Sequence, residues 1–298
     1  MSLTKKQFDI LVALEAGGAP MSQREIAAET EISLGSVNKI HSELTAVGYV
    51  KDGKITEAGL EALEPYRVKR AIFMAAGFGS RMVPITLNTP KPLVRVKGKR
   101  IIDSLLDAVV GLGIKEIYIV RGYLADQFDQ LVQKYPDITF IVNPAYNESN
   151  NISSAHCIRH LLPNSYVFEA DLLLYNPKII TKYQYQSNYL GIYTDRTEDW
   201  CFVTDSNGRI KKLGVGGVDC YQEVGISYWT AADGERLGKQ IDEVYSNMPG
   251  GKEKYWDQVA LEEYIDDYKI YVRPCHFSDI IEIDTFNELK KIDPIYAM

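Results

Sequence analysis

The sequence predicts an α/β fold, a doubly wound and mostly parallel sheet, with a small domain of another kind in front of it. From residue 67 onward, runs of β-branched and aromatic residues alternate with segments of helical periodicity, as in successive βαβ units. Before residue 67 the pattern is three short helices followed by a hairpin. Pro65 separates the two patterns, because the residue before a proline disfavours helix. We therefore predict two domains, residues 1–66 and residues 67–298.

The N-terminal domain is predicted from helical spacing and capping signals. Apolar spacing predicts a helix over Lys5–Ala16, and Ser22 followed by Glu25 is a capping-box pattern that opens a second helix. A third helix begins at Ser33, and the Asp52-Gly53 pair marks the turn of a hairpin. This order resembles a winged helix-turn-helix domain.

That resemblance suggests DNA binding through the third helix, but the charge does not favour it. Residues 1–70 carry nine Lys or Arg and ten Asp or Glu, a net charge of −1. DNA-binding domains usually present a basic face. We therefore favour a packing or dimerisation module, and with it a possible homodimer, over a DNA-binding domain.

Composition places the whole chain among globular proteins of a reducing compartment. Its 298 residues are 46% hydrophobic, enough for two cores, and a net charge of −7 argues against non-specific nucleic-acid binding. The four cysteines lack the paired spacing of a zinc site or disulfide framework. The sequence shows no signal peptide and no apolar run long enough to cross a bilayer. We expect a cytoplasmic protein without membrane contact.

The second domain opens with a glycine-rich loop after a buried strand. Ala71–Met74 is the predicted strand, and Gly77 and Gly79 allow tight turns with no side chain in the way. Such a loop presents backbone N–H groups to an anion, and Arg81 and Lys91 add positive charge beside it. These features suit a bound nucleoside triphosphate. The predicted nucleotide-binding residues of the loop are Ala75, Ala76, Gly77, Gly79, Ser80 and Arg81.

The extended loop resembles the signature of the sugar-phosphate and choline-phosphate nucleotidyltransferases. The pattern Ala-Ala-Gly-x-Gly-x-Arg-Met-x-Pro-x-Thr-x-x-x-Pro-Lys-x-Leu is met from Ala75 to Leu93. The resemblance implies a Rossmann-like nucleotidyltransferase fold whose loop binds the triphosphate, with Arg81 and Lys91 as catalytic basic residues. The family pattern often continues with Gly-Lys-Pro, whereas this chain has Arg100 in the last position, which weakens a helix-start signal.

Helices and strands then alternate along the chain. Periodicity predicts helices over Ile101–Gly111 and Leu124–Leu131 and strands over Ile117–Val120 and Ile138–Val142. The Gly122-Tyr123 pair follows a strand at the edge where ligands of such sheets bind. By resemblance this pair faces the nucleotide base, although a tyrosine at a strand end is as often a packing residue.

A polar run from Asn147 to Ser154 leads into another predicted helix. It is either a capped helix start or a place where Asn151 reaches the ribose or the acceptor substrate, and both interpretations stay open.

Three carboxylates resemble the family's metal site. Asp171 ends the predicted strand that begins at Tyr166, and carboxylate oxygens are the ligands that hard cations prefer. Glu282 and Asp284 alternate in a second strand, so their side chains share one face. The resemblance implies that the three hold Mg²⁺, with Asp171 also catalytic. The alternative for Glu282 and Asp284 is the polar face of an edge strand.

Aromatic residues are frequent between these carboxylates. A quaternary ammonium ion binds aromatic faces, often beside a carboxylate. Trp200, Tyr255 and Asp257 resemble the choline-pocket positions of bacterial choline-phosphate cytidylyltransferases.

The resemblance as a whole implies Mg²⁺-dependent cytidylyl transfer from CTP to phosphocholine, giving CDP-choline and pyrophosphate. The preference for CTP rests on the resemblance alone. Phosphoethanolamine, aminoethylphosphonate and, less favoured, a sugar 1-phosphate are alternative acceptors. A nucleotide-sensing transcriptional regulator is the alternative of another class. The intact set of Arg81, Lys91, Asp171, Glu282 and Asp284 argues against it.

Overall fold

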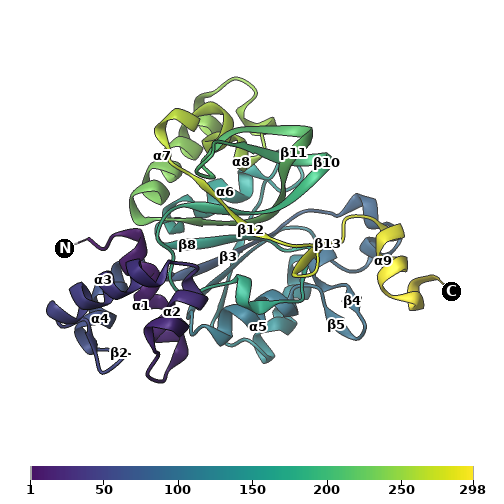
Figure 1. Cartoon of the computed structure of the whole chain (residues 1–298). Coiled ribbons are helices and arrows are strands. Elements are labelled where there is room, and N and C mark those ends of the chain that lie inside the picture. Colours follow the sequence, from purple (N-terminus) through teal and green to yellow (C-terminus); the bar gives the residue numbers. More distant parts are fainter. Residues whose placement is uncertain (1, 298) are drawn as a thin grey trace. The chain divides into compact units, whose positions relative to one another are not determined.

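The computed structural model describes residues 2–297, which form two compact units (Figure 1). One unit comprises the chain up to Arg67 together with Tyr183–Tyr185. The other comprises Val68–Lys182 and the chain from Gln186 onward. Within the described range, none of the helices has the length and apolar character needed to cross a bilayer.

The N-terminal unit contains the predicted helices and hairpin. Its elements are α1 (Lys5–Gly17), α2 (Gln23–Thr30), α3 (Leu34–Ala46), β1 (Val50–Lys51), β2 (Lys54–Ile55), α4 (Glu57–Leu63) and the 3-10 turn η1 (Glu64–Tyr66). The capping box that opens α2 is confirmed, since Ser22 N donates to the Glu25 carboxylate at 2.7 Å and Glu25 N donates to Ser22 Oγ. The Asp52 and Gly53 turn residues both have positive φ, 51° and 71°, as a two-residue hairpin turn requires.

The core of this unit also holds residues from far along the chain. The ring centroid of Tyr185 lies 5.4 Å from that of Phe8 and 5.5 Å from that of Tyr66, on which the Tyr185 ring stacks. Gln184 N donates to the Tyr66 carbonyl at 2.8 Å, and Tyr183 is buried among the apolar residues. The sequence pattern did not indicate that this segment belongs to the N-terminal unit.

The second unit is built on a seven-stranded mixed sheet, which confirms the predicted α/β class. Its strands, in spatial order, are β12 (Tyr271–Cys275), β10 (Asn188–Thr204), β11 (Ile210–Trp229), β8 (Ser165–Glu169), β3 (Arg70–Ala75), β6 (Glu116–Arg121) and β7 (Ile138–Val142). The four neighbours β8, β3, β6 and β7 run parallel, and β12 runs parallel to β10. β11 is antiparallel to both of its neighbours, which the sequence did not predict.

Helices cover both faces of the sheet, as in a doubly wound fold (Figure 1). On one face, α5 (Asp103–Gly111) packs against side chains such as Phe73 of β3. On the other face, α6 (Ile152–Ile158) and α7 (Ala231–Asn247) pack against Ile72 and Met74. Alternate residues of β3 thus serve two cores, which explains why this strand reads as continuously apolar.

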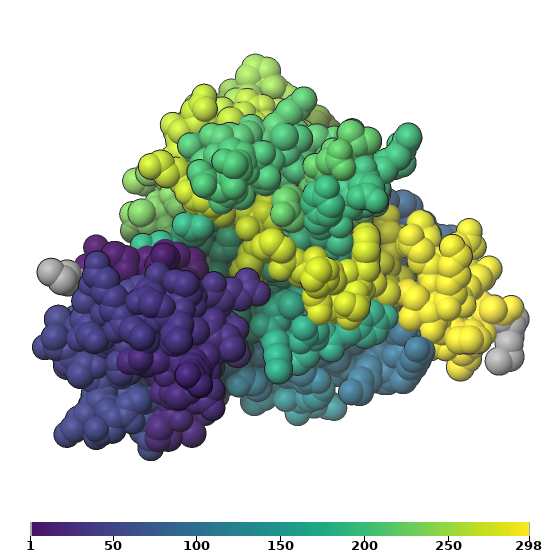
Figure 2. All heavy atoms as spheres, viewed as in Figure 1, coloured from purple at the N-terminus to yellow at the C-terminus, as the bar shows by residue number. Residues whose placement is uncertain are grey.

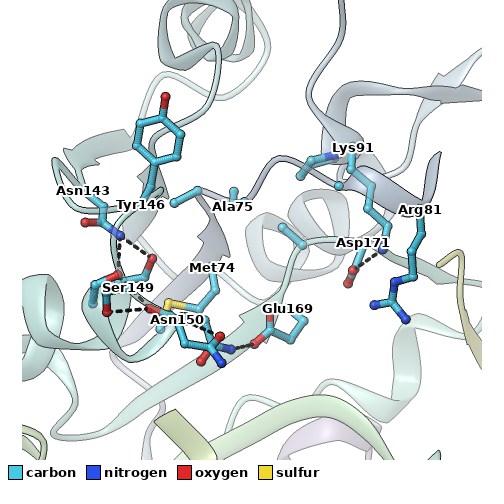
Figure 3. A pocket seen from close by; sticks show the side chains of 18 residues that line it. Met74, Ala75, Arg81, Lys91, Asn143, Tyr146, Ser149, Asn150, Glu169 and Asp171 are labelled. Atoms are coloured by element: carbon cyan, nitrogen blue, oxygen red, sulfur yellow. Dashed lines mark hydrogen bonds and ion pairs between the residues drawn. The ribbon is translucent and has the colours of Figure 1, made fainter. Parts of the chain in front are cut away.

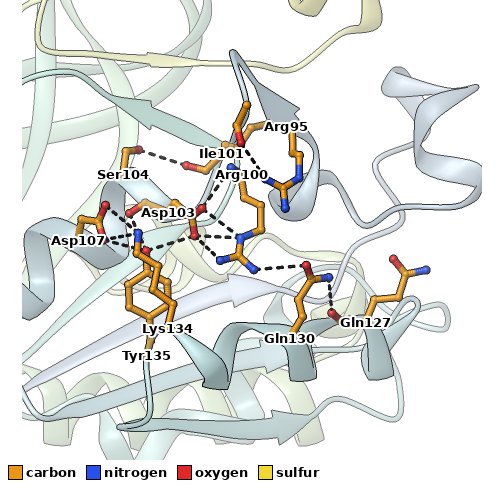
Figure 4. A network of polar contacts seen from close by, with 11 residues as sticks. Arg95, Arg100, Ile101, Asp103, Ser104, Asp107, Gln127, Gln130, Lys134 and Tyr135 are labelled. Carbon is orange, nitrogen blue, oxygen red and sulfur yellow. Dashed lines mark hydrogen bonds and ion pairs between the residues drawn. The ribbon is translucent and has the colours of Figure 1, made fainter.

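Arg100, which replaces the expected proline, anchors the start of α5 (Figure 4). Its Nε donates to both Asp103 carboxylate oxygens, at 3.0 and 3.1 Å, and both residues are buried. Tyr135 Oη also contacts Asp103 and donates to Asp107 at 2.9 Å. The segment before Tyr135, predicted as a helix, is the 3-10 helix η5 (Ala125–Gln133).

The C-terminal residues pack on the region after the glycine-rich loop. β13 (Ile280–Glu282) pairs with β9 (Leu172–Leu174), and α9 (Phe286–Ile292) follows. Figure 2 shows these residues (yellow) on the surface. The strand ends at Glu282, so Asp284 lies just after it, whereas we expected both carboxylates within one strand.

The remaining elements are short. They are the strands β4 (Arg95–Val96) and β5 (Lys99–Arg100), the helix α8 (Trp256–Gln258), the π-helical turn η9 (Val259–Glu263), and the 3-10 turns η2 (Ser80–Met82), η3 (Ile85–Leu87), η4 (Lys91–Leu93), η6 (Arg159–Leu161), η7 (Pro177–Ile179), η8 (Gly251–Glu253), η10 (Ile265–Asp267) and η11 (Pro294–Ala297).

Candidate active site

The glycine-rich loop leaves the carboxyl end of β3 and turns sharply at Gly79. The φ of Gly79 is +67°, and a Cβ placed there would lie 3.1 Å from the Cβ of Lys91 and 3.2 Å from Thr86 Cγ2. Thr86 Oγ1 donates to the Gly79 carbonyl at 2.9 Å and fixes the turn. Glycine is therefore required here both by the backbone angle and by the close approach of Lys91.

The loop lines a cavity of about 290 Å³ (Figure 3). Ala75, Ala76, Gly77, Gly79 and Arg81, five of the predicted loop residues, face it together with Lys91 and Asp171. Ser80 instead lines a neighbouring cavity.

Gly122 and Tyr123 line neither cavity and support the site from behind. Tyr123 Oη donates to the carbonyls of Thr86 and Leu87 at 2.9 and 3.0 Å. A Cβ on Gly122 would lie 2.6 Å from Tyr146 atoms, so glycine lets Tyr146 reach the first cavity. Contact of Gly122 and Tyr123 with the nucleotide base stays a prediction.

The polar wall of the first cavity includes residues of the predicted polar run, Asn147–Ser154, and one residue that was not predicted, Asn143. Asn143 is buried, and its Nδ2 donates to the hydroxyls of Ser153 and Ser154 at 3.0 Å each. Asn143 directly follows β7, and an amide after a buried strand could have suggested this role.

Asn151 lies where the first cavity meets the second. Its Oδ1 accepts from Trp256 N at 2.9 Å, and its Nδ2 lies 3.5 Å from Glu169 Oε1. Asn151 lines both cavities, as do Arg81, Glu169 and Asp171. The structure therefore fixes the Asn151 side chain at the junction, although its contact with a substrate stays a prediction.

The three predicted metal ligands come together at this junction. One oxygen from each of Asp171, Glu282 and Asp284 lies within 4.8 Å of the other two. Asp171 Oδ1 is buried and has no hydrogen-bond partner among the described residues. Burial, and then the charge of Asp171, raise the pKa of Glu282 to about 8. An orphaned carboxylate oxygen within an all-oxygen cluster fits a hard divalent cation.

Lys91 and Arg81 partly neutralise these carboxylates. Lys91 Nζ lies 2.7 Å from Asp171 Oδ2 and 3.0 Å from Asp284 Oδ1, and Arg81 pairs with Asp284. Burial alone would lower the pKa of Lys91, but the two carboxylates outweigh burial and raise it. Lys91 is therefore a fixed cation at the centre of the site.

The second cavity, of about 560 Å³, holds the predicted acceptor residues. Trp200 and Tyr255 meet edge to face with ring centroids 5.7 Å apart. Asp257 accepts from the hydroxyl of the buried Tyr189 at 2.7 Å, and burial raises the pKa of Asp257 to about 7. The structure thus brings together three residues predicted from two separate segments.

Three further carboxylates line the second cavity and were not among the predicted site residues: the exposed Asp199, and Glu169 and Glu223. Glu169 ends β8 and accepts from Trp256 Nε1 at 3.4 Å. Glu223 lies within β11. Burial is the main reason why the pKa of Glu169 and that of Glu223 are well above the usual range, and Asp257 adds to both shifts. Glu169 could have been found from the sequence, because it lies two positions before Asp171 at the end of the same predicted strand.

Comparisons with known proteins agree with this geometry. Residues 70–190 match the nucleotidyl transferase family, and residues 1–54 match the MarR family. The chain is similar to a 2-aminoethylphosphonate cytidylyltransferase of Lancefieldella rimae, with 36% identity over 76% of this chain and 93% of that protein. It is also similar to the choline-phosphate cytidylyltransferase of Streptococcus pneumoniae, with 32% identity over 76% and 97%.

A solved structure extends the comparison to three dimensions. The CTP:phosphocholine cytidylyltransferase from Streptococcus pneumoniae superposes with a TM-score of 0.71 at 32% identity, covering 77% of this chain and 99% of that one. A putative glucose-1-phosphate thymidylyltransferase from Bacillus anthracis, at 17% identity and a TM-score of 0.60, shares the fold. The chain belongs to the nucleotidyl transferase family as a cytidylyltransferase, and a MarR-like winged-helix domain precedes its catalytic domain.

Proposed function

We propose that the protein transfers the cytidylyl group of CTP to phosphocholine in a Mg²⁺-dependent reaction. The observation that carries this proposal is that two cavities meet at one carboxylate cluster. The glycine-rich loop borders one cavity, and the Trp200–Tyr255 pair borders the other. A donor and an acceptor would thus meet beside Lys91.

The reaction is a displacement at the α-phosphorus of CTP. An oxygen of the acceptor phosphate forms the new bond to phosphorus, and the bond to the bridging oxygen of pyrophosphate breaks. A phosphomonoester is largely doubly ionised at pH 7, because its second pKa is about 6, so no general base is needed. Catalysis then consists of positioning and neutralisation of charge.

Lys91 and Arg81 are suited to these two tasks. Lys91 is 8% exposed, lines the first cavity and pairs with Asp171 and Asp284 of the second, so it can hold the attacking and α-phosphates together. Arg81 has a side chain 70% exposed, free to swing toward the departing pyrophosphate. When bound by Asp171, Glu282 and Asp284, Mg²⁺ would neutralise phosphate oxygens.

The ring pair of the second cavity supports a quaternary ammonium acceptor. Trp200 and Tyr255 are aromatic residues that line this cavity, and Asp257 adds a carboxylate to the same lining. Cation–π attraction requires no N–H donor and therefore suits a trimethylammonium group.

A second candidate acceptor is 2-aminoethylphosphonate or phosphoethanolamine. The specific observation is that the cavity also holds Glu169 and Glu223, and carboxylates can accept hydrogen bonds from a primary ammonium. The similarity to a 2-aminoethylphosphonate cytidylyltransferase points the same way.

Pyrophosphate release tests the proposal. The protein is incubated with Mg²⁺ and each of four nucleoside triphosphates against phosphocholine, phosphoethanolamine, 2-aminoethylphosphonate and a sugar 1-phosphate. We expect release with CTP and phosphocholine, and its loss on addition of a chelator. A higher kcat/KM with phosphoethanolamine or 2-aminoethylphosphonate than with phosphocholine would show that the second candidate is the acceptor. No release with any pair would refute enzymatic function and favour a nucleotide sensor.

A further inference from the structure

An irregular stretch of β11 turns Glu223 toward the acceptor cavity. The pairing of β10 with β11 passes from Tyr189 opposite Ser227 to Gly191 opposite Glu223, so β11 carries two more residues than β10 over this span. Gly225 lies within it at a φ of +77°. Such a bulge interrupts the alternation of side chains and re-aims them. As a result, the four consecutive residues from Gln222 to Gly225 all line the second cavity.

The carboxylate of Glu223 differs from its neighbours because nothing within residues 2–297 bonds to it. Asp257 accepts from Tyr189, and Glu169 accepts from Trp256. No hydrogen bond or ion pair joins the Glu223 side chain to the described residues. Asp257, Glu169 and Glu282 are the charged groups whose fields act on it, and all three are acidic. An approaching cation favours the charged form of a carboxyl group in this setting.

Most of the charged side chains that line the second cavity are acidic. Its lining includes one basic side chain, Arg81, which pairs with Asp284. The acidic side chains of the lining are Glu169, Asp171, Asp199, Glu223, Asp257, Glu282 and Asp284. Lys91 forms ion pairs with Asp171 and Asp284, and Arg81 forms one with Asp284. Neither basic residue pairs with Glu223 or Asp257. The acidic side chains that have no basic partner therefore lie in the acceptor half.

We propose that Glu223 is a specificity-determining residue that accepts hydrogen bonds from a primary ammonium on the acceptor. The acceptor class is a phosphate or phosphonate with an amine two carbons away. This inference rests on the proposed cytidylyl transfer and concerns its second candidate acceptor, 2-aminoethylphosphonate or phosphoethanolamine. A trimethylammonium has no N–H to donate, so it gains from the Trp200–Tyr255 rings but not from a hydrogen bond to Glu223. The ratio of the two acceptors therefore depends on Glu223.

Binding of phosphoethanolamine and of n-propyl phosphate, measured by calorimetry on the full chain, tests the role of Glu223 without turnover. The two ligands differ in replacing an ammonium by a methyl group. Both titrations contain Mg²⁺ and a CTP analogue that cannot be cleaved between its α- and β-phosphates. We expect wild type to prefer phosphoethanolamine about ten-fold or more, since a hydrogen bond to a charged group is worth at least about that factor. Glu223→Gln should remove most of this preference.

Glu198→Gln is the matched control. It makes the same chemical change on an exposed side chain of β10 that pairs with Arg196 and lies outside the cavity lining. We expect it to keep the wild-type preference. The absence of a preference in wild type, or an unchanged preference in Glu223→Gln, would overturn the proposal. The absence of a preference in wild type decides against the proposal even if the variant fails to fold.

Turnover provides the second arm and separates the two proposals. With CTP, Glu223→Gln should lower the kcat/KM ratio of phosphoethanolamine to phosphocholine about ten-fold, and 2-aminoethylphosphonate run in parallel tells the ester from the phosphonate. A wild-type protein that releases no pyrophosphate but binds these ligands with a selectivity that Glu223→Gln loses would refute the proposed transfer and support Glu223. An active enzyme whose acceptor ratio is unchanged in Glu223→Gln would do the reverse.

Discussion

Replacing Trp200 by alanine should weaken phosphocholine binding and leave CTP binding nearly unchanged. Trp200 is part-buried and meets Tyr255 at a ring distance of 5.7 Å on the border of the acceptor cavity. Cation–π attraction is worth about 0.5–1 kcal/mol at exposed sites and about 2 kcal/mol when desolvated. A half-buried ring lies between these limits, so we expect a loss of about 1–2 kcal/mol. That loss corresponds to a rise in KM for phosphocholine of about five- to thirty-fold.

The assay measures pyrophosphate release while phosphocholine and CTP are varied separately. Trp200→Phe is the matched variant, because it keeps an aromatic face and should recover most of the affinity. Thermal unfolding is measured in parallel, since Trp200 also packs against the apolar cluster on the sheet face that α6 and α7 cover. Equal increases in both KM values, together with a lowered Tm in Trp200→Ala, would show that the ring is a packing residue and refute the ammonium-binding role.

Three other changes test the metal site, the acidic cavity and the N-terminal unit. Asp171→Asn should lower kcat by more than ten-fold at saturating Mg²⁺, which is about 1.4 kcal/mol, and wild-type turnover would exclude Asp171 as a ligand. Burial raises the pKa of Asp257 from 3.8 in an unperturbed chain to about 7, so the folded state holds a proton that the unfolded state has lost. Stability should therefore fall as pH rises from about 4 to 7, and Asp257→Asn should flatten this fall in Tm; parallel curves would contradict the assignment. Tyr183→Ala should cost about 3–5 kcal/mol, as for other large buried rings, and speed amide exchange in residues 2–67 while kcat is retained; unchanged exchange would place Tyr183 outside that core.

The parts of the site that depend on local sequence could be predicted. The glycine-rich turn is an example, because the glycine that adopts a φ of +67°, Gly79, and the basic residue Arg81 are only two positions apart. The meeting of Asp171 with Glu282 and Asp284 is a contact between distant segments. It was predicted by resemblance to a family pattern and could not be read from spacing alone.

The parts that depend on sheet irregularity could not be predicted. Strict alternation would place Glu223 and Gly225 on one face of the strand and Gln222 and Val224 on the other. The bulge that changes this becomes visible only when β11 is paired with β10. The direction of β11 also depends on its partners rather than on its composition. The role of Tyr183 and Tyr185 also depends on distant partners. The sequence shows them only as two aromatic residues of an aromatic-rich segment, whereas in the structure they pack in the same core as Phe8.

That last contact has a consequence for synthesis on the ribosome. The N-terminal unit lacks Tyr183–Tyr185 until well over a hundred further residues have been translated after Arg67. At about 5–20 residues per second, this delay is on the order of ten seconds. During it, the ring faces of Phe8 and Tyr66 that later meet Tyr185 are unshielded, while β3, β6 and β8 have already emerged. The first unit to leave the ribosome therefore cannot finish folding until the second unit's first segment, Val68–Lys182, and the three residues after it have been made.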